Sequence, residues 1–262
     1  MTDAPQVPTD TAVLPSGAAM PLLGFGTWRL SGEQAVRATA EALSAGYRHV
    51  DTATMYGNER EIGRALAEHR GESVFVTTKL PPERAGRERE TLEQSLEALG
   101  VESVDLWLVH WPPGGAGVRV WERFVAARAD GLVRDIGVSN YSVEQIDELD
   151  GATGVRPAVN QVPWSPRRFD AALLERHRER GVVLEGYSGL KDGVLDDRDV
   201  REMADRLDRT PAQVVLRWHL EHGVVVIPKS SDPERIRSNA DVGGWRLDPD
   251  DVAVLDALGR SG

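Results

Sequence analysis

The stretch that decides the fold is Arg48-His49-Val50-Asp51-Thr52-Ala53-Thr54-Met55-Tyr56-Gly57-Asn58-Glu59. It begins as a short apolar strand that ends on Asp51, and it presents Tyr56 five residues later. Two later apolar segments also run into a titratable residue: Val74 to Thr78 before Lys79, and Val104 to Val109 before His110. In a parallel α/β barrel the carboxyl ends of the strands share one face, where chemistry is carried out. These four polar residues are therefore candidates for one site.

Short apolar runs alternate with segments of helical spacing along the rest of the chain. Strands are predicted over the opening stretch and over residues 22–26, 74–78, 106–110, 135–138, 157–161, 182–187 and 224–227. Helices are predicted over residues 31–45, 58–69, 87–99, 118–129, 142–149, 170–180, 196–222 and 232–240, with a last one over 249–258. Before the first strand, the turn signal Pro15-Ser16-Gly17 indicates a β-hairpin.

Eight strand-plus-helix units match the size of a (β/α)8 barrel, and short apolar strands between helices are typical of a parallel sheet. The alternative is an open, doubly wound dinucleotide fold. Its Gly-x-Gly-x-x-Gly fingerprint fails here, because Gly24-Phe25-Gly26-Thr27-Trp28-Arg29 ends on arginine. We predict an α/β protein with a flexible tail over residues 1–10 and one TIM barrel over residues 11–262. The barrel carries an N-terminal β-hairpin and a short C-terminal tail.

The composition excludes several classes of protein. Cysteine is absent, which excludes disulfides, thiolate metal sites and cysteine nucleophiles and fits a cytoplasmic protein. The net charge of −11 argues against binding to nucleic acid or to anionic lipid. The first residues lack a signal-peptide pattern, and no apolar window reaches the ~18 residues of a membrane span. We expect a cytoplasmic monomer whose partner is a small molecule.

The four strand-end residues suit proton donation to a carbonyl group. Tyrosine has an ordinary pKa of about 10, which an adjacent lysine ammonium lowers by stabilising the phenolate. An aspartate keeps that lysine charged, and a histidine can hydrogen-bond the oxygen that the tyrosine protonates. Singly, each residue also has an ordinary role as a solvated or loop-capping group, a lid over the core, or a satisfied buried histidine. Their occurrence at three successive strand ends favours the functional interpretation.

Several motifs in a fixed order resemble those of a known family. They are Gly24-Phe25-Gly26-Thr27-Trp28, Gly46-Tyr47-Arg48-His49-Val50-Asp51-Thr52-Ala53, Tyr56-Gly57-Asn58-Glu59, Leu108-Val109-His110-Trp111-Pro112, Gly137-Val138-Ser139-Asn140, Val159-Asn160-Gln161, Ile227-Pro228-Lys229-Ser230-Ser231 and Arg235-Ile236-Arg237-Ser238-Asn239. On these motifs the chain resembles the aldo-keto reductases over almost its whole length. Within that family it is most similar to the bacterial branch that includes 2,5-diketo-D-gluconate reductases.

The resemblance implies reduction of aldehydes or ketones to alcohols with NADPH, by hydride transfer from nicotinamide C4. Tyr56 would be the general acid, Lys79 the partner that lowers its pKa, Asp51 the counter-ion of the lysine, and His110 the group that orients the carbonyl. The cofactor carries the difficult chemistry, while the protein positions and polarises the reacting groups.

The resemblance also assigns a binding site for NADPH or NADP+. Its residues are Ser139, Asn140 and Gln161 at the carboxamide, Tyr187 at the nicotinamide ring, Ser188 and Leu190 at the pyrophosphate, Lys229, Ser230, Ser231 and Arg235 at the 2′-phosphate, and Asn239 at the adenine. Two cations with hydroxyl donors suit a dianion. The loop before Asp232 also fits an ordinary helix start, because serine and aspartate cap helices well. The candidates for the apolar wall of the substrate pocket are Trp28, Met55 and Trp111.

Two other functions stay open on the sequence. The chain could be an NADPH-binding regulatory or sensor subunit with low turnover, because fold does not fix function. It could also be an unrelated barrel such as a sugar isomerase, which would not need Arg235 or a stacking Tyr187. No metal site is predicted. His219 and His222 lie on one predicted helix without a third ligand nearby in sequence, and a solvated helix face explains them more simply.

Overall fold

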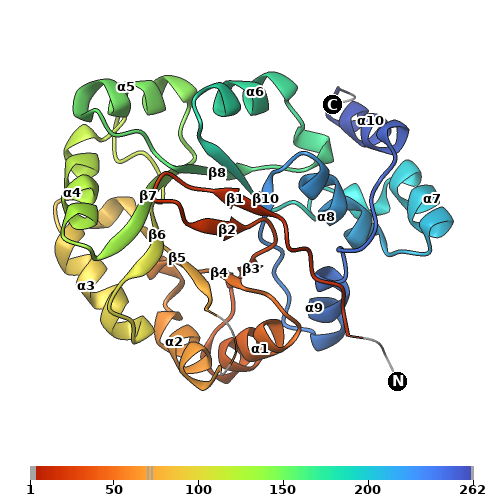
Figure 1. Ribbon diagram of the computed structural model, residues 1–262, viewed down its shortest axis with the longest axis horizontal. Coiled ribbons are helices and arrows are strands. Elements are labelled where there is room, and N and C mark those ends of the chain that lie inside the picture. Colours follow the sequence, from red (N-terminus) through yellow and green to blue (C-terminus); the bar gives the residue numbers. More distant parts are fainter. Residues whose placement is uncertain (1–3, 70, 72, 261–262) are drawn as a thin grey trace.

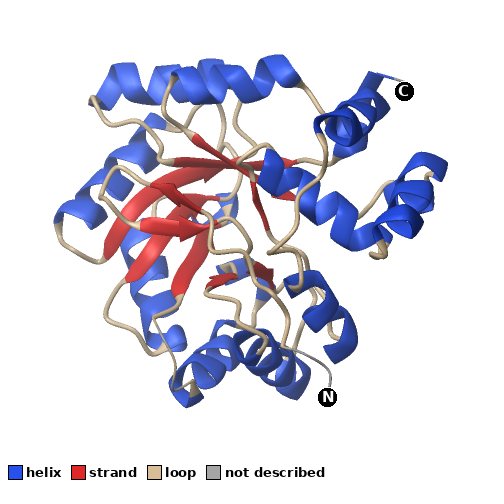
Figure 2. Cartoon of the chain, turned by 45° about the vertical axis from the view of Figure 1, so that its right-hand side comes forward, coloured by secondary structure: helices blue, strands red, loops and turns tan. Residues whose placement is uncertain are grey.

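The computed structural model describes residues 4–69, 71 and 73–260. Its main sheet has eight parallel strands, which helices surround (Figures 1 and 2). In chain order the strands are β3 (Phe25–Gly26), β4 (His49–Asp51), β5 (Phe75–Leu80), β6 (Val104–Val109), β7 (Val133–Ser139), β8 (Val159–Pro163), β9 (Val183–Tyr187) and β10 (Val225–Val226). Each strand pairs with the next in the chain, so the sheet order follows the sequence order.

The first and last strands of this sheet meet along what we call the β3–β10 seam. Leu23, just before β3, forms a parallel bridge with Val226 of β10. The backbone N–H of Gly26 donates to the carbonyl oxygen of Pro228 at 3.0 Å. Glycine permits this approach, because a Cβ at Gly26 would lie 2.7 Å from the carbonyl oxygen of Ile227. The sheet is thereby closed, and the predicted (β/α)8 barrel is confirmed.

Helices cover the outside of the barrel (Figure 2). They are α1 (Gly32–Ser44), α2 (Glu59–Glu68), α3 (Glu88–Leu99), α4 (Val118–Ala129), α5 (Val143–Thr153), α6 (Ala171–Glu179), α7 (Arg198–Leu207), α8 (Pro211–Glu221), α9 (Pro233–Ala240) and α10 (Pro249–Ala257). Capping boxes at Ser142 and Thr210 begin α5 and α8. The predicted helical segment 196–222 consists of two helices, because Asp208 ends α7 in a left-handed conformation with φ 52°. No helix in the described part of the chain has the length and apolar character that a bilayer span requires.

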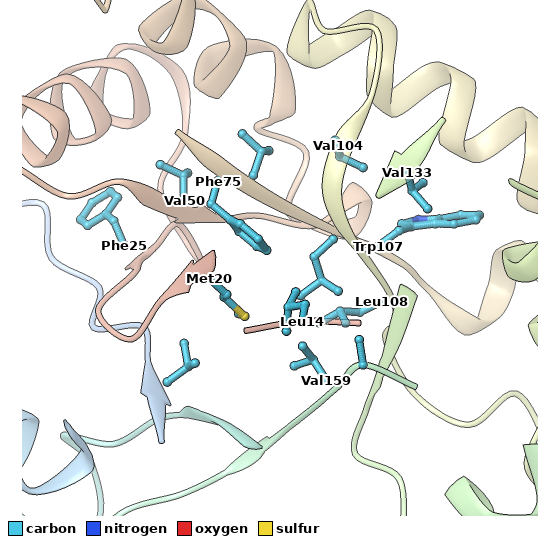
Figure 3. Close-up of a cluster of buried hydrophobic side chains, with 14 of the residues drawn as sticks. Leu14, Met20, Phe25, Val50, Phe75, Val104, Trp107, Leu108, Val133 and Val159 are labelled. Carbon is cyan, nitrogen blue, oxygen red and sulfur yellow. The ribbon is translucent and has the colours of Figure 1, made fainter. Parts of the chain in front are cut away.

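The predicted N-terminal hairpin lies across one end of the barrel (Figure 1). Its strands, β1 (Thr11–Val13) and β2 (Ala19–Pro21), pair antiparallel. Leu14 and Met20 are buried, and they lie among side chains of the barrel strands such as Val50 (Figure 3). The hairpin therefore closes the amino-terminal end of the barrel with apolar groups.

A polar contact also anchors the hairpin. Asp135, near the start of β7, accepts hydrogen bonds from the backbone N–H of Ser16 at 3.2 Å and from the Ser16 hydroxyl. Asp135 is almost fully buried, so these two neutral donors replace the water that its carboxylate would otherwise bind. The turn of the hairpin is thus tied to a strand of the barrel.

Part of the segment expected to be a flexible tail is held to the barrel. The backbone N–H of Gln6 donates to Asp241 Oδ1 at 2.8 Å, and Gln6 O accepts the N–H of Gly243 at 2.6 Å. Val7 packs against the main core cluster. Residues 1–3 of that predicted tail and residues 261–262 of the predicted barrel lie outside the described residues.

Candidate active site

The structure brings the four predicted catalytic residues together at the carboxyl end of the barrel. Asp51 is the last residue of β4, and Tyr56 ends η1 (Thr54–Tyr56), the 3-10 turn that follows. Lys79 lies near the end of β5, and His110 directly follows β6. Because β4, β5 and β6 are adjacent and parallel, their carboxyl ends converge on one place.

Lys79 lies at the centre of this group, fully buried. Its Nζ donates to Asp51 Oδ1 at 2.6 Å, to Asp51 Oδ2 at 2.7 Å and to the carbonyl oxygen of Thr52 at 2.8 Å. Tyr56 Oη lies 3.4 Å from the same nitrogen. Burial acts to lower the pKa of Lys79, but the Asp51 carboxylate and Tyr56 outweigh it, so the pKa is raised above its ordinary value. The lysine is therefore a fixed cation beside the tyrosine hydroxyl.

The pKa of Tyr56 lies above its ordinary value. Burial raises it most, Lys79 lowers it, and Asp51 and Glu185 raise it again. Lys79 therefore lowers the pKa of Tyr56 as expected, but burial raises that pKa by more. Tyr56 keeps its proton near neutral pH and has the ammonium of Lys79 ready to stabilise the phenolate that remains after proton donation.

His110 is electrically neutral in this site. Burial and then the charge of Lys79 lower its pKa to about 2. Its ring lies 5.8 Å from the ring of Tyr56, measured between centroids, and stacks at 4.2 Å on the ring of Trp111. A neutral imidazole can donate a hydrogen bond to a carbonyl oxygen, but it has no extra proton to give up. Tyr56 and His110 are thus chemically distinct groups.

A cavity of about 860 Å³ opens next to these residues. Most of the predicted site residues line it: Asp51, Tyr56, His110, Ser139, Asn140, Gln161, Tyr187, Ser188, Leu190, Lys229, Ser230, Arg235, Asn239, Trp28, Met55 and Trp111. Lys79 is not part of the lining; it is buried beneath it and contacts two lining residues, Asp51 and Tyr56. Ser231 is exposed to solvent and lies outside the lining. The structure therefore gathers the predicted cofactor and substrate residues around one cavity, with Ser231 apart from them.

Hydrogen bonds connect six of the cavity residues to one another. Asn140 Nδ2 donates to the carbonyl oxygen of His110 at 3.1 Å and to Ser139 Oγ at 3.0 Å. Tyr187 Oη donates to Asn140 Oδ1 at 2.8 Å. Gln161 Nε2 donates to Asp51 Oδ2 at 2.9 Å, so this amide touches the buried ion pair as well as the cavity. The network fixes the polar wall beside Tyr56.

The backbone around the cavity is locally strained. Arg29, Asn140 and Ser188 have φ values of 63°, 64° and 58°, in the left-handed region that side chains other than glycine rarely adopt. All three line the cavity. Such strain persists only where the surrounding structure enforces it, and it clusters at functional sites.

Three cations gather at one side of the cavity. Lys229 and Arg235 were predicted there, and Arg29 joins them. Burial, then Arg29, then Arg235 lower the pKa of Lys229, so every charge that acts on this amine is positive. Arg235 is exposed and has Asp232 as a neighbour at 3.5 Å. Such a cluster of mutually repelling cations suits an anion of high charge density.

Two residues of this region, Arg29 and Glu185, were not predicted from the sequence. Arg29 directly follows the Gly24-to-Trp28 motif, three residues after β3 ends, and a basic residue so close to a strand end was the available signal. Glu185 is fully buried on β9. A single acidic residue inside the apolar run from Val182 to Tyr187 indicates a buried carboxyl group, which must be protonated or paired.

The prediction of a solvated helix face is wrong for His219. This residue is fully buried, with Nδ1 2.8 Å from the carbonyl oxygen of Val215. It packs against Gly189, where a Cβ would lie 2.9 Å from the imidazole. His222 instead pairs with Asp256 at 2.8 Å. Among the residues that the structure describes, no three histidine or carboxylate side chains are grouped so as to hold a metal ion.

Comparison with known proteins identifies the family. The model of the aldo/keto reductase family matches residues 22–260. The chain belongs to this family of enzymes. An aldo-keto reductase of Mycolicibacterium vanbaalenii is 44% identical over 98% of this chain and 94% of its own length. Methylglyoxal reductase DkgA of Salmonella typhimurium is 40% identical over 94% of this chain and 92% of its own.

The same branch of the family includes the diketo-gluconate reductases named above. The 2,5-diketo-D-gluconic acid reductase B of a Corynebacterium strain is 40% identical to this chain, over 98% of the chain and 95% of its own length. The predicted membership of the bacterial branch is thereby confirmed.

Two solved structures agree with the fold. The aldo/keto reductase of Brucella melitensis superposes with a TM-score of 0.91 at 36% identity, over 96% of this chain and 99% of its own. The aldo-keto reductase of Bombyx mori, solved in complex with NADP, superposes with a TM-score of 0.88 at 29% identity, over 97% of this chain and 93% of its own.

Proposed function

We propose that this chain reduces aldehydes or ketones to alcohols with NADPH, and that Tyr56 donates the proton. One observation carries the proposal. Lys79 Nζ lies between the carboxylate of Asp51, at 2.6 Å, and the hydroxyl of Tyr56, at 3.4 Å, directly beside a cavity large enough for a cofactor and a small substrate. Membership of the aldo/keto reductase family supports the same reaction.

The cofactor fits the residues that are present. The cations Arg29, Lys229 and Arg235 suit the phosphate groups of NADPH, in particular its 2′-phosphate. Tyr187 offers an aromatic face at the cavity, and the Ser139–Asn140–Gln161 network offers polar groups for the carboxamide. We assign Ser188 and Leu190 to the pyrophosphate and Asn239 to the adenine, and we leave Ser231 out because it lies outside the lining. The relative of Bombyx mori, whose structure contains NADP, supports this assignment.

Bound NADPH supplies the hydride that the carbonyl carbon accepts. The protein supplies the proton and the positioning. The neutral imidazole of His110 donates a hydrogen bond to the carbonyl oxygen, which polarises the C=O bond and orients it. Tyr56 then gives its hydroxyl proton to the oxygen that becomes an alkoxide. The ammonium of Lys79 stabilises the resulting phenolate, while Asp51 holds the ammonium in place.

Part of the cavity wall is apolar. Trp28, Met55 and Trp111 are 43%, 41% and 39% exposed, which is unusual for large apolar side chains, and all three line the cavity beside Tyr56. Exposed apolar surface of this kind marks a binding site. We assign these three residues to the organic part of the carbonyl substrate.

The proposal includes a monomeric, cytoplasmic enzyme. Every residue assigned to the site belongs to one chain, so the chemistry requires no second copy. The absence of cysteine suits a reducing compartment. Analytical ultracentrifugation measures the first point, and fractionation of the native cell measures the second.

The proposed acid is tested by replacing Tyr56. NADPH is mixed with a panel of aldehydes and ketones, and loss of the reduced nicotinamide absorbance is followed for the wild type and for Tyr56→Phe. The phenylalanine keeps the ring and its packing, so the rate should fall by roughly 10²–10⁴-fold while NADPH binding is kept. Equal rates for the two proteins would refute the role of Tyr56. Background rates for the wild type with every substrate would instead favour the alternative of a low-turnover sensor subunit.

The proposed phosphate site is tested by replacing Arg235. In Arg235→Ala the dissociation constant of NADPH should rise about 10–100-fold, because a hydrogen bond between charged groups is lost, whereas that of NADH should change little. The matched control is Arg237→Ala on the same helix, where the guanidinium pairs with Glu41 at 2.8 Å. An equal loss for both cofactors, or an equal effect of both substitutions, would remove Arg235 from the phosphate site.

A further inference from the structure

A second buried carboxyl group lies in the interior of the barrel, below the Lys79–Asp51 pair. Glu185 is the third residue of β9 and has no exposed surface. Among the described residues, no side chain donates a hydrogen bond of ordinary geometry to either of its carboxylate oxygens. The amide of Gln161, which donates to Asp51 Oδ2, is the neighbouring donor that acts on the pKa of Glu185, and it lowers that pKa. The nearest basic atom is His49 Nε2, at 3.9 Å from Oε1. A carboxylate with full charge and no donor would be unstable in such a place.

The charges of Lys79, Asp51 and Glu185 do not balance if both carboxyl groups are ionised. Lys79 donates to both oxygens of Asp51 and to a backbone carbonyl, so its three N–H groups are directed at partners other than Glu185. His49 cannot compensate, because burial, above all, lowers its pKa to about 3 and leaves the ring neutral. One cation thus faces two carboxyl groups. The geometry points to a proton on Glu185.

The groups around Glu185 are few. From β4 it faces His49 and Asp51, and from β5 it faces Lys79, while Tyr56 lies beyond the pair. Its partners in register on the two neighbouring strands are Gln161 on β8 and Val225 on β10, and neither titrates. Burial, and then the charge of Asp51, raise the pKa of Glu185 to about 8, because they outweigh the lowering effects of the Gln161 amide and of Lys79. The group therefore changes charge just above neutral pH.

Glu185 acts on Tyr56 as well as on the ion pair. Its negative charge is one of the influences that raise the pKa of Tyr56. A tyrosine with a higher pKa is a weaker proton donor, because the phenolate it leaves behind is less stable. The protonation state of Glu185 therefore bears on the step for which Tyr56 is proposed.

We propose that Glu185 is a positioning residue for carbonyl reduction: protonated, it leaves the charge of Lys79 to the Tyr56 phenolate, and its ionisation slows the reaction at alkaline pH. The inference rests on the proposed function. It adds a residue that acts through Lys79 and Tyr56, without contact to the substrate, and it assigns the alkaline limit of the rate to a carboxyl group.

The pH dependence of the reduction rate tests the inference. The wild type should lose activity by about tenfold between pH 7 and pH 9 as Glu185 ionises, whereas Glu185→Gln, which keeps the shape and cannot ionise, should change less than about twofold. The control is Asp135→Asn, which removes a buried carboxylate at the other end of the barrel and should keep the wild-type profile. The same alkaline decline in wild type and Glu185→Gln would overturn the proposal.

Thermal unfolding tests the ionisation without any catalysis. Folding raises the pKa of Glu185 above its unfolded value, so its stabilising contribution is complete below the unfolded value of 4.5 and is lost as the pH rises to about 8. The melting temperature of the wild type should therefore fall relative to that of Glu185→Gln between pH 5 and pH 8. Parallel curves would overturn the inference even if the wild type proves to have no reductase activity.

A measurement on the wild type alone covers the case in which Glu185→Gln does not fold. In protein labelled with ¹³C at the glutamate carboxyl carbon, one signal should titrate near pH 8. The signal supports the inference, and a spectrum in which all glutamates titrate below pH 6 overturns it. Failure of the proposed function appears separately, as absence of turnover in the aldehyde and ketone panel.

Discussion

The two ends of the barrel each bury an aspartate, and they treat it differently. At the amino-terminal end, Asp135 accepts hydrogen bonds from the backbone and hydroxyl of Ser16, under a hairpin that inserts Leu14 and Met20 into the core. At the carboxyl end, both carboxylate oxygens of Asp51 accept hydrogen bonds from the ammonium group of Lys79, beside an open cavity. The same fold thus closes one end with neutral donors and keeps a charge pair at the other.

The difference indicates that the contacts at the amino-terminal end mainly stabilise the fold, whereas those at the carboxyl end mainly hold charged groups beside the cavity. A carboxylate bound by neutral donors and covered by apolar groups, such as that of Asp135, contributes to the stability of the fold. A buried ion pair contributes less to stability, because desolvation of both charges offsets their attraction. In the proposed mechanism this pair positions the ammonium that reaches the hydroxyl of Tyr56. The strained backbone of Asn140 and Ser188 is found at this end too.

The largest effect is expected at the charged end, from Lys79→Met. The methionine fills much of the space but leaves Asp51 buried without a cation, which should cost about 3–5 kcal/mol of unfolding free energy. The reduction rate should fall at least as much as in Tyr56→Phe, because the phenolate loses its stabilising charge. Urea unfolding and the NADPH assay measure the two effects. A stable, active Lys79→Met would mean that the charge pair is not the feature that separates the two ends.

The next largest effect is expected at the closed end, from Met20→Ala. Truncation of this fully buried side chain should cost about 2–5 kcal/mol of unfolding free energy, since a cavity is left under the hairpin. At temperatures where the variant is folded, its kcat should equal that of the wild type. A selective loss of kcat in folded Met20→Ala would contradict the separation of the two ends.

Acid should destabilise the charged end through His110. The pKa of His110 is about 2 in the folded protein, below its ordinary value of 6.5. Between these two pH values the histidine is therefore protonated in the unfolded chain and neutral in the folded chain. Stability is therefore lost as the pH falls below 6.5, by about 2 kcal/mol at pH 5 for this group. His110→Gln should lose less stability than the wild type between pH 7 and pH 5 in urea unfolding. Identical losses would show that His110 is charged or exposed in the folded state.

The smallest effect is expected from Ser16→Ala at the closed end. The substitution removes one of the two donors to Asp135 and should cost about 1–2 kcal/mol of unfolding free energy. The melting temperature measures this loss. The pH profile of carbonyl reduction should stay unchanged, and a shifted profile would mean that charges at the two ends influence each other through the barrel.

The barrel itself could be predicted from the sequence because its signal is repeated. Eight apolar runs separated by helical spacing determine the architecture even when single boundaries are misplaced by a few residues, as at β7, which begins at Val133 instead of the predicted Asp135. The three strand ends that carry Asp51, Lys79 and His110 could be recognised for the same reason. A titratable residue after an apolar strand stands out locally.

Features that depend on contacts between distant segments could not be predicted. His219 was assigned to a solvated face because of its polar ring, but Gly186 and Gly189 leave room for that ring in the interior. Arg29 joins Lys229 only because the barrel closes, which brings the beginning and the end of the sheet together. The raised pKa of Tyr56 likewise reflects its burial, a property that no local pattern encodes. The spacing of residues in the sequence indicated which side chains belong to the site, whereas their pKa values depend on the packing of the folded chain.

The β3–β10 seam joins the two shortest strands of the barrel, each two residues long. Few backbone hydrogen bonds hold it, so local opening of the barrel should begin there, and its amides should exchange with solvent sooner than those of β6 and β7. Arg29 and Lys229, on opposite sides of this junction, would both be engaged by one phosphate-bearing ligand. Such a ligand would link the two sides of the β3–β10 seam. Because it binds only the closed barrel, its binding would stabilise the seam, which is the least stable part of the sheet.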